Sequence, residues 1–389
     1  PSSRYGFRNR TQGRLIQASR RKRVPMSDER IPDTNHHMFD ARVGTKVAVT
    51  YLDDPCIGWT EYLSDFIGSA LRHENKITPA IIIPGTSHIT PAFDRLTEAT
   101  GTPVFIEDGN GHRELRSGMW APNLAQFFEG APRSQFTVSQ QFLHQTPTPD
   151  LIPTLMLSAS IYHPARRTTK LGRAIEIIIE TLLPDPSTTL SWGRYEPVGA
   201  PWDRNRLTAL ARELMPEVHF NLAAHSDLGT LSGTTTVART SNGLEEYVEV
   251  SVAIPDLAPS QQIDVVNRLL DTIAEQTKPQ FLLAVRIQAL TDTSLPTSIR
   301  QPPVPLAVLI GAAGIRQLGV DVRDVARQHA GRTYGSGRRQ GLIVPVETTQ
   351  ADWSALSSLV ATLDGDAGNI ARVLEDPTDG SGAGSTHAS

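Results

Sequence analysis

Ser87 and His88 combine reactive side chains with a position that suits ligand binding. They follow residues 79–83, a short apolar run, and α/β sheets place ligand sites at the carboxyl ends of such strands. A serine nucleophile at a strand-to-helix elbow requires Gly-x-Ser-x-Gly, and residues 85–89 lack the second glycine. Both residues are candidate ligand contacts, although capping of the following helix is the simpler role for Ser87.

Glu107 and Asp108 stand at the end of the next expected strand, where two carboxyl groups can act as general acid and base. They lead directly into an Asn-Gly turn at 110–111, and acidic residues are ordinary in such turns. The turn explains them without chemistry, so no catalytic residue is assigned.

Three arginines gather around a glycine-rich segment near the C-terminal end. Residues 335–341 read Gly-Ser-Gly-Arg-Arg-Gln-Gly and contain Arg338 and Arg339, and Arg332 precedes them. Guanidinium groups and adjacent backbone N–H groups bind phosphate or carboxylate. The segment differs from a dinucleotide-binding loop, because it precedes an expected strand and its third glycine is displaced. An anion site and a solvated loop are the two alternatives.

The histidines and the single cysteine do not match a metal-binding pattern. His219, His225 and Asp227 lie close together in the sequence but lack the i, i+4 helical spacing, and no cysteine assists them. Cys56 excludes an internal disulfide because it has no second thiol to pair with, and we interpret it as a small core residue. Neither a metal nor a cofactor is expected.

Three large aromatic side chains, Trp192, Tyr195 and Trp202, lie in residues 184–203, a segment rich in proline and glycine. Rigid rings in an exposed loop often anchor a protein partner. Packing of a long connector onto the core explains them equally well. They are candidate partner contacts.

Charge is distributed unevenly along the chain. The first 25 residues hold eight basic side chains and no acidic one, which leaves 29 basic against 41 acidic side chains in the remainder. A basic arm can bind nucleic acid, whereas the sequence Met26-Ser27-Asp28-Glu29 suggests a translation start and an upstream extension. The acidic remainder disfavours nucleic acid as a partner.

The longest uncharged apolar stretch, 304–315, is far shorter than the roughly 20 residues of a membrane-spanning helix. Together with the single cysteine, this predicts a cytoplasmic protein without membrane insertion. The sequence does not predict an oligomeric state.

Hydrophobic spacing predicts a mixed α/β fold. The first half alternates strands and helices as β-α-β-α-β, which indicates a small parallel sheet, at residues 46–52, 59–71, 79–83, 91–100 and 104–106. A strand at 155–162 and a helix at 168–183 follow. The second half opens with antiparallel strands and continues with covering helices.

The shift in composition at 184–203 predicts a boundary between two domains. The expected organisation is a basic lead-in at 1–42, an N-terminal α/β domain at 43–183, a connector at 184–203, a C-terminal α+β domain at 204–364 and a flexible tail at 365–389.

Several short patterns resemble an actinobacterial family of unknown function that is often encoded near type VII secretion genes. They are Trp192-Gly193-x-x-Glu196-Pro197, Pro201-Trp202, residues 207–211, Asp108-Gly109-x-Gly111, Ser117-Gly118, residues 243–246 and residues 303–308. The resemblance implies a role near the secretion of small helical proteins and assigns no catalytic residue. Residues 112–116 depart from the family pattern.

These observations favour a non-enzymatic accessory or chaperone-like factor that binds another protein, such as a secreted helical substrate or a secretion component. The alternative is an enzyme or small-ligand-binding domain whose site lies at the carboxyl ends of the N-terminal sheet or in the arginine segment 332–339.

Overall fold

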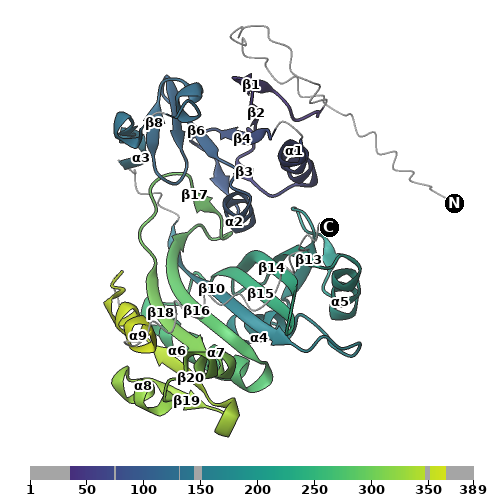
Figure 1. Cartoon of the computed structure of the whole chain (residues 1–389), viewed down its shortest axis with the longest axis vertical. Coiled ribbons are helices and arrows are strands. Elements are labelled where there is room, and N and C mark those ends of the chain that lie inside the picture. The colour runs from purple at the N-terminus through teal and green to yellow at the C-terminus, as the bar shows by residue number, and fades with distance from the viewer. Residues whose placement is uncertain (1–35, 74–75, 131, 144–150, 347–350, 365–389) are drawn as a thin grey trace, which may run out of the picture. The chain divides into compact units, whose positions relative to one another are not determined.

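The computed structural model describes residues 36–73, 76–130, 132–143, 151–346 and 351–364. Within these ranges the chain forms two large sheets and one small sheet, with helices packed against them (Figure 1). The mixed α/β class expected from the sequence is confirmed. No helix in these ranges combines the length and the apolar character needed to cross a membrane.

The first large sheet contains the expected parallel unit. Its parallel strands and their helices follow in chain order as β2 (Val47–Tyr51), α1 (Glu61–Arg72), β4 (Thr78–Ile83), α2 (Pro91–Ala99) and β6 (Val104–Asp108). Antiparallel strands extend the sheet on both sides, namely β1 (Ala41–Val43), β7 (Gly111–Glu114), β8 (Met119–Ala121) and β9 (Thr137–Val138). The β-α-β-α-β prediction is therefore confirmed.

Threonine caps begin both helices of this unit. The Thr60 hydroxyl accepts the N–H of Leu63 at 3.2 Å, and the Thr90 hydroxyl accepts the N–H of Phe93 at 3.1 Å. Pro91 follows Thr90 in the first helical turn, where the missing N–H costs no hydrogen bond. Each cap fixes the point at which the chain leaves the strand end and turns into a helix.

The second large sheet is antiparallel throughout. Its spatial order is β12 (Ala200–Pro201), β11 (Thr189–Gly193), β13 (Glu217–His225), β14 (Thr230–Thr240), β15 (Gly243–Ala253), β10 (Ile152–His163), β16 (Pro279–Ala289), β18 (Val304–Ile310), β20 (Gly341–Pro345) and β19 (Arg332–Tyr334). Residues 240 and 243 pair across a two-residue loop, which makes β14 and β15 a hairpin.

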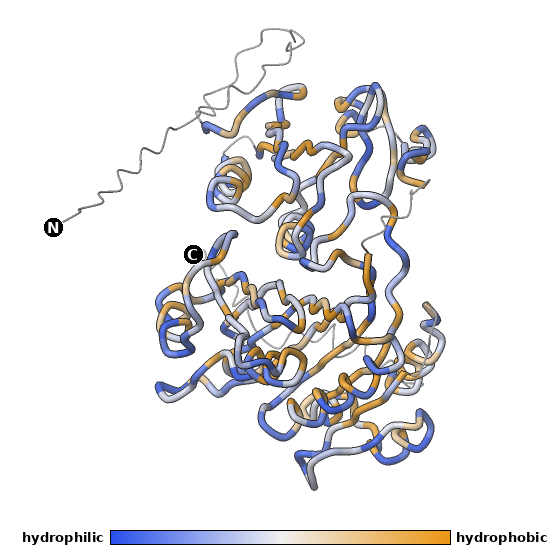
Figure 2. Tube along the Cα trace, turned by 180° about the vertical axis from the view of Figure 1, so that it is seen from behind, coloured by the Kyte–Doolittle hydropathy of each residue, from blue (hydrophilic) through white to orange (hydrophobic). Residues whose placement is uncertain are grey.

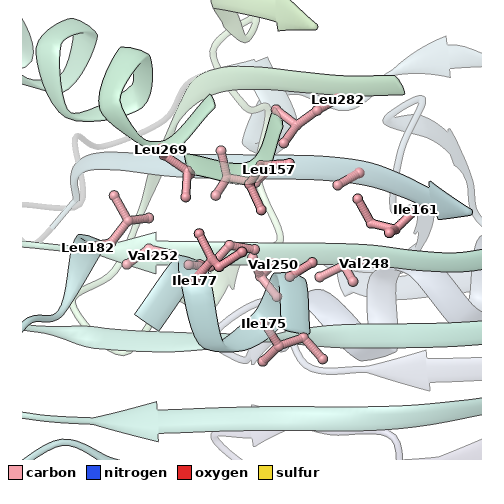
Figure 3. Close-up of a cluster of buried hydrophobic side chains, with 14 of the residues drawn as sticks. Leu157, Ile161, Ile175, Ile177, Leu182, Val248, Val250, Val252, Leu269 and Leu282 are labelled. Carbon is pink, nitrogen blue, oxygen red and sulfur yellow. The ribbon is translucent and has the colours of Figure 1, made fainter. Parts of the chain in front are cut away.

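One face of the ten-stranded sheet carries the largest hydrophobic core, and we call it the outer face. It packs against α4 (Arg173–Leu182), α5 (Arg204–Glu213) and α6 (Pro259–Gln276). Leu157 and Val250 of the sheet meet Ile177 of α4 and Leu269 of α6, as Figure 3 shows. Each of these four side chains is at most 1% exposed, so each contributes roughly 1.5–3 kcal/mol of burial free energy. Apolar stretches also follow these strands and helices in Figure 2.

The opposite face is apolar only toward the C-terminal strands. There Val308 and Val344 pack against α7 (Ala312–Leu318), α8 (Val322–Gln328) and α9 (Ser354–Asp364). Leu309, next to Val308, belongs to the outer-face core, as the alternation of a strand requires.

A small sheet joins segments from the two halves of the sequence. Its strands are β17 (Leu295–Pro296), β5 (His88–Ile89) and β3 (Cys56–Ile57), with β5 in the middle. β5 pairs parallel with β3 and antiparallel with β17. Leu295 and Ile89 then share one hydrophobic cluster with α1 and α2.

Two details differ from the sequence-based expectations. The helix expected at 168–183 begins at Arg173, preceded by Gly172 with a φ of +86°. The segment 184–203, expected as a connector, contributes β11 and β12 to the ten-stranded sheet. The sequence did not indicate these two short strands, because their prolines and glycines resemble a loop. Sheet edges tolerate both residue types.

The sheets also divide the chain differently from the expected boundary at 184–203. β10 and α4 precede that boundary, yet β10 lies between β15 and β16, and α4 packs on the outer face. Sheet membership changes between residues 138 and 152. The described elements belong to one compact unit, and a division into two domains stays a prediction. Residues 1–35 of the expected lead-in at 1–42, and the expected tail at 365–389, lie outside the described residues.

Candidate functional site: an acidic cleft

A polar surface lies on the ten-stranded sheet opposite its main core, beneath α2, and we call it the inner face. Its members alternate with core residues along β10, β14 and β15, and they are Met156, Ser232, Thr234, Glu249 and Ser251. Helix α2 packs on β14 here. Side chains with hydroxyl and carboxyl groups cover this part of the sheet, where a core would place aliphatic ones.

A cavity with a volume of about 930 Å³ lies between this inner face and the segments around β3 and α1. Its acidic lining residues are Asp54, Glu196 and Asp292, and neither lysine nor arginine is among the described residues that line it. We call it the acidic cleft. Its walls also include the apolar residues Leu52, Ile57 and Val198 and the aromatic Tyr62.

Glu196 ties the cleft to the N-terminal segments. Its Oε2 accepts the N–H of Trp59 at 2.7 Å and the Thr90 hydroxyl at 2.6 Å. Both donors flank the starts of α1 and α2, so one carboxyl group holds two helix entries against the loop between β11 and β12. Burial raises the pKa of Glu196, and the two hydrogen bonds oppose that rise in part.

Asp292 uses one oxygen for structure in a similar way. Its Oδ1 accepts the N–H of Ser294 at 2.9 Å and the Ser294 hydroxyl at 2.6 Å. Within the described part of the chain, Oδ2 of Asp292 and Oε1 of Glu196 accept no hydrogen bond from another side chain or N–H group. These oxygens can accept a hydrogen bond from a ligand.

Cys56 places its exposed thiol in the cleft, which corrects its interpretation as a core residue. Desolvation by the cleft walls and the charges of Asp292 and Glu196 raise the pKa of Cys56 to about 11. A catalytic thiol needs a lowered pKa, because the thiolate is the nucleophile. The acidic surroundings therefore suppress cysteine chemistry at this site.

The three aromatic candidates do not form an exposed anchor. Trp192 is 3% exposed, packs edge-on against Phe220 and donates its indole N–H to the Pro201 carbonyl at 3.0 Å. Trp192 therefore follows the alternative of packing onto the core, because a ring this buried offers no surface to a partner. Trp202 is partly buried on the outer-face core and donates to Glu176 at 3.2 Å.

Tyr195 packs partly buried against the cluster of α1 and α2, and the Arg194 guanidinium lies 5.5 Å from its ring centroid. Its neighbour Glu196 carries the interactions that reach the cleft.

Ser87 and His88 lie next to the cleft without lining it. Ser87 is 3% exposed and donates its hydroxyl to the Asp54 carbonyl at 2.8 Å. This bond fixes the loop that presents Asp54, so Ser87 holds the loop in place. His88 belongs to β5, between β3 and β17. A role for Ser87 as a helix cap is wrong, since Thr90 caps α2.

The arginines do not converge on an anion site. Arg332 bonds Asp271 at 2.9 Å and Asn267 at 3.1 Å, both on α6. Arg338 and Arg339 are exposed on a short 3-10 turn, and the Arg338 carbonyl accepts a bond from Arg316. Arg332 is therefore engaged with a helix, whereas the other two face solvent.

The acidic and histidine candidates also do not come together in one site. Glu107 is exposed, whereas Asp108 is 5% exposed and lies 3.4 Å from Arg113, which excludes a shared acid–base site. His219 contacts the Thr236 hydroxyl at 3.3 Å, and His225 lines the acidic cleft. In the described ranges, no three side chains of histidine, cysteine, aspartate or glutamate are arranged to hold a metal ion.

Sequence reasoning missed the residues that matter most in the cleft. Glu196 stood in a quoted family pattern, so that pattern was an available signal. Asp54 stood in an Asp-Asp-Pro turn after β2, and Asp292 in a Thr-Asp-Thr-Ser turn. Turn chemistry is the ordinary explanation of both, and only the fold brings them to one cavity.

Comparison with known proteins gives one match. The model of a family described as DUF6177, C-terminal domain, matches residues 154–365, which is more than half of the chain. The match begins inside β10 and so includes every strand of the ten-stranded sheet. Searches of curated proteins and of solved structures find no match.

Proposed function

This chain belongs to the DUF6177 family, a family of unknown function, and we propose that it is a non-enzymatic, chaperone-like factor that binds another protein in the acidic cleft. The observation that carries the proposal is the lining of that cleft, whose described residues include three acidic side chains, neither lysine nor arginine, and a thiol of raised pKa. Such a lining recognises positive charge and lacks an activated nucleophile.

A partner segment with basic residues and aliphatic or aromatic neighbours complements this cleft. Its lysine or arginine groups would meet Asp54, Asp292 and Glu196, and its apolar side chains would meet the walls. Tyr62 is 64% exposed beside His37, whose ring centroid lies 4.9 Å from that of Tyr62. An exposed aromatic pair next to a cavity is typical of a protein interface.

The cellular setting of this proposal rests on the family resemblance alone. It implies an actinobacterial, cytoplasmic protein encoded near type VII secretion genes. On that basis the partner is a secreted helical protein or a component of the secretion system. A helix with basic and apolar side chains on one face is the form such a partner would present.

The proposal is tested by capture of partners on the full chain and on two double variants. Asp54→Asn/Asp292→Asn removes two of the three carboxylates of the cleft while keeping hydrogen-bond acceptors. Asp256→Asn/Asp264→Asn removes the same charge at two exposed positions outside the cleft. Proteins from the source cell would be identified by mass spectrometry after capture.

We expect a stoichiometric partner that binds the wild type and the control variant equally and the cleft variant at least about tenfold more weakly. Equal capture by all three proteins would contradict the role of the cleft. Turnover of a small molecule by the wild type would contradict the non-enzymatic role.

A small-ligand site is the second candidate, and the position of the cleft favours it. Asp54 follows β2, and Thr90 follows β4 and β5, so the cleft begins near the carboxyl ends of the parallel strands. Ligands of α/β proteins bind there. Native mass spectrometry of the protein purified from its source would reveal a bound metabolite if this alternative holds.

A further inference from the structure

A second pocket, with a volume of about 350 Å³, lies between α2 and the inner face of the ten-stranded sheet. Its walls come from Met156, Ile287, Leu295 and Pro302, so most of its interior contacts would be apolar. The volume is at the lower end of the range for small-molecule sites, which start at roughly 300 Å³. The pocket therefore suits a molecule with one compact apolar group.

Charged groups of both signs stand around this apolar space. Arg95 of α2 pairs with Glu249 of the inner face, and Arg300 pairs with Asp94 of α2. Their side chains are only 18–32% exposed, so water screens them incompletely. The described lining also includes the exposed Glu98, so a ligand that enters the pocket meets two guanidinium groups and three carboxylates.

Each ion pair leaves donors or acceptors unused. Arg95 bonds Glu249 through one terminal nitrogen, and its guanidinium is held over the Tyr247 ring at 4.6 Å. Oε2 of Glu249 accepts hydrogen bonds from both Arg95 and the Tyr247 hydroxyl. Among the described residues, Nε of Arg95 and Oε1 of Glu249 have no hydrogen-bond partner, and neither has the second terminal nitrogen of Arg300.

We propose that this pocket binds a free amino acid with an apolar side chain. The apolar side chain occupies the space between Met156 and Leu295. The carboxylate accepts from the unused N–H groups of Arg95 and Arg300, and the ammonium group donates to Glu249. A zwitterion complements both signs of the two partly buried ion pairs, whereas a simple anion or cation would face one of their carboxylates or guanidinium groups as a like charge.

The site is separate from the proposed partner-binding function. Pro91 is the one residue shared by the linings of the two cavities, and the charged groups of each are different. Failure of amino-acid binding would therefore leave partner capture at the acidic cleft unaffected.

The test is isothermal titration calorimetry of the full chain with three probes that share one side chain. L-Phenylalanine carries both charges, its amide lacks the carboxylate, and N-acetyl-L-phenylalanine lacks the ammonium group. L-Leucine and L-methionine extend the test to aliphatic side chains. We expect at least one of the amino acids L-phenylalanine, L-leucine and L-methionine to bind. The two blocked analogues should bind at least tenfold more weakly than L-phenylalanine.

Three variants locate the binding. Met156→Trp fills the pocket and should abolish binding, whereas Val360→Trp adds the same ring at an exposed position of α9 and should not. Arg95→Gln removes a carboxylate contact, so it should narrow the difference between L-phenylalanine and its amide. Loss of fold would instead weaken all probes together.

Absence of binding by all three amino acids at millimolar concentration would overturn the proposal. So would unchanged binding by Met156→Trp, or equal affinity for the acetylated and free forms.

Discussion

The two faces of the ten-stranded sheet use the same strands for different purposes. On β10, Leu157 is fully buried against α4 and α6, whereas Ser158, its neighbour, points to the inner side. On β15, Val250 belongs to the core and Glu249 to the inner face. Period-two alternation therefore separates the residues that stabilise the fold from those that line cavities. Recognition can change on one face without a cost in stability on the other.

The largest expected effect is on the outer face. Leu157→Ala should lower the free energy of unfolding by about 2–5 kcal/mol, because it leaves a cavity in a core without water. Ser158→Ala, the matched change on the other face, should stay within about 0.5 kcal/mol. Urea denaturation of both variants measures the difference. Equal losses in the free energy of unfolding for the two variants would contradict the difference between the faces.

Glu246 is a buried polar residue on the outer face. It has 0% exposure and belongs to the same strand as the core valines. It accepts the N–H of Gly172, at the start of α4, and a bond from His163, both at 2.8 Å. Glu246→Ala leaves a buried N–H group unpaired and should destabilise the protein by about 1–3 kcal/mol.

Glu245→Ala provides the control, because Glu245 is partly exposed and its main contact is the Ser160 hydroxyl. Thermal unfolding should show the smaller loss for this variant. A larger loss for Glu245→Ala would contradict the assignment of Glu246 to the outer-face structure.

The raised pKa of Glu196 predicts that the stability of the protein depends on pH through a group in the cleft. Its pKa is raised above the ordinary value of 4.5 in the folded state, so the folded protein holds the proton more tightly than the unfolded chain. This contribution to stability is present below pH 4.5 and is lost as the pH rises through the raised pKa. Glu196→Gln should remove that dependence, as chemical denaturation across pH 4–8 would show. An unchanged profile would mean that other groups cause it.

The smallest effect is expected at the arginine turn. Arg338→Ala and Arg339→Ala alter exposed side chains and should change stability by less than about 0.5 kcal/mol. Arg332→Ala should cost up to about 1 kcal/mol, since it loses an exposed pair with Asp271. Differential scanning calorimetry resolves this ranking. Phosphate binding that Arg338→Ala abolishes would revive the anion-site alternative.

The spacing of hydrophobic residues predicted the parallel unit and the antiparallel strands correctly, because helices and strands each have a period that shows among neighbouring residues. The short strands β11 and β12 were missed, since prolines and glycines at a sheet edge resemble a loop. The sequence left exposure and packing of Trp192 as equal alternatives, and its ring packs in the core beside Phe220.

The acidic cleft was beyond prediction for a different reason. Asp54 and Glu196 lie 142 positions apart and Glu196 and Asp292 lie 96 apart, and each stands in a turn or loop where acidic residues are common. Only the pairing of β5 with both β3 and β17 brings the segments at Asp54 and Asp292 together. Sequence spacing carries no information about such a meeting.

The most direct test of the account uses Cys56, the single cysteine of the chain, as a reporter inside the cleft. Its alkylation by iodoacetamide would be followed by intact mass at pH 8, with and without a captured partner. With its pKa raised to about 11, the thiol should react about 10- to 100-fold more slowly than a free cysteine, and the partner should slow it further. A partner that binds without protecting Cys56, or a thiol that reacts faster than free cysteine, would contradict a non-enzymatic binding cleft.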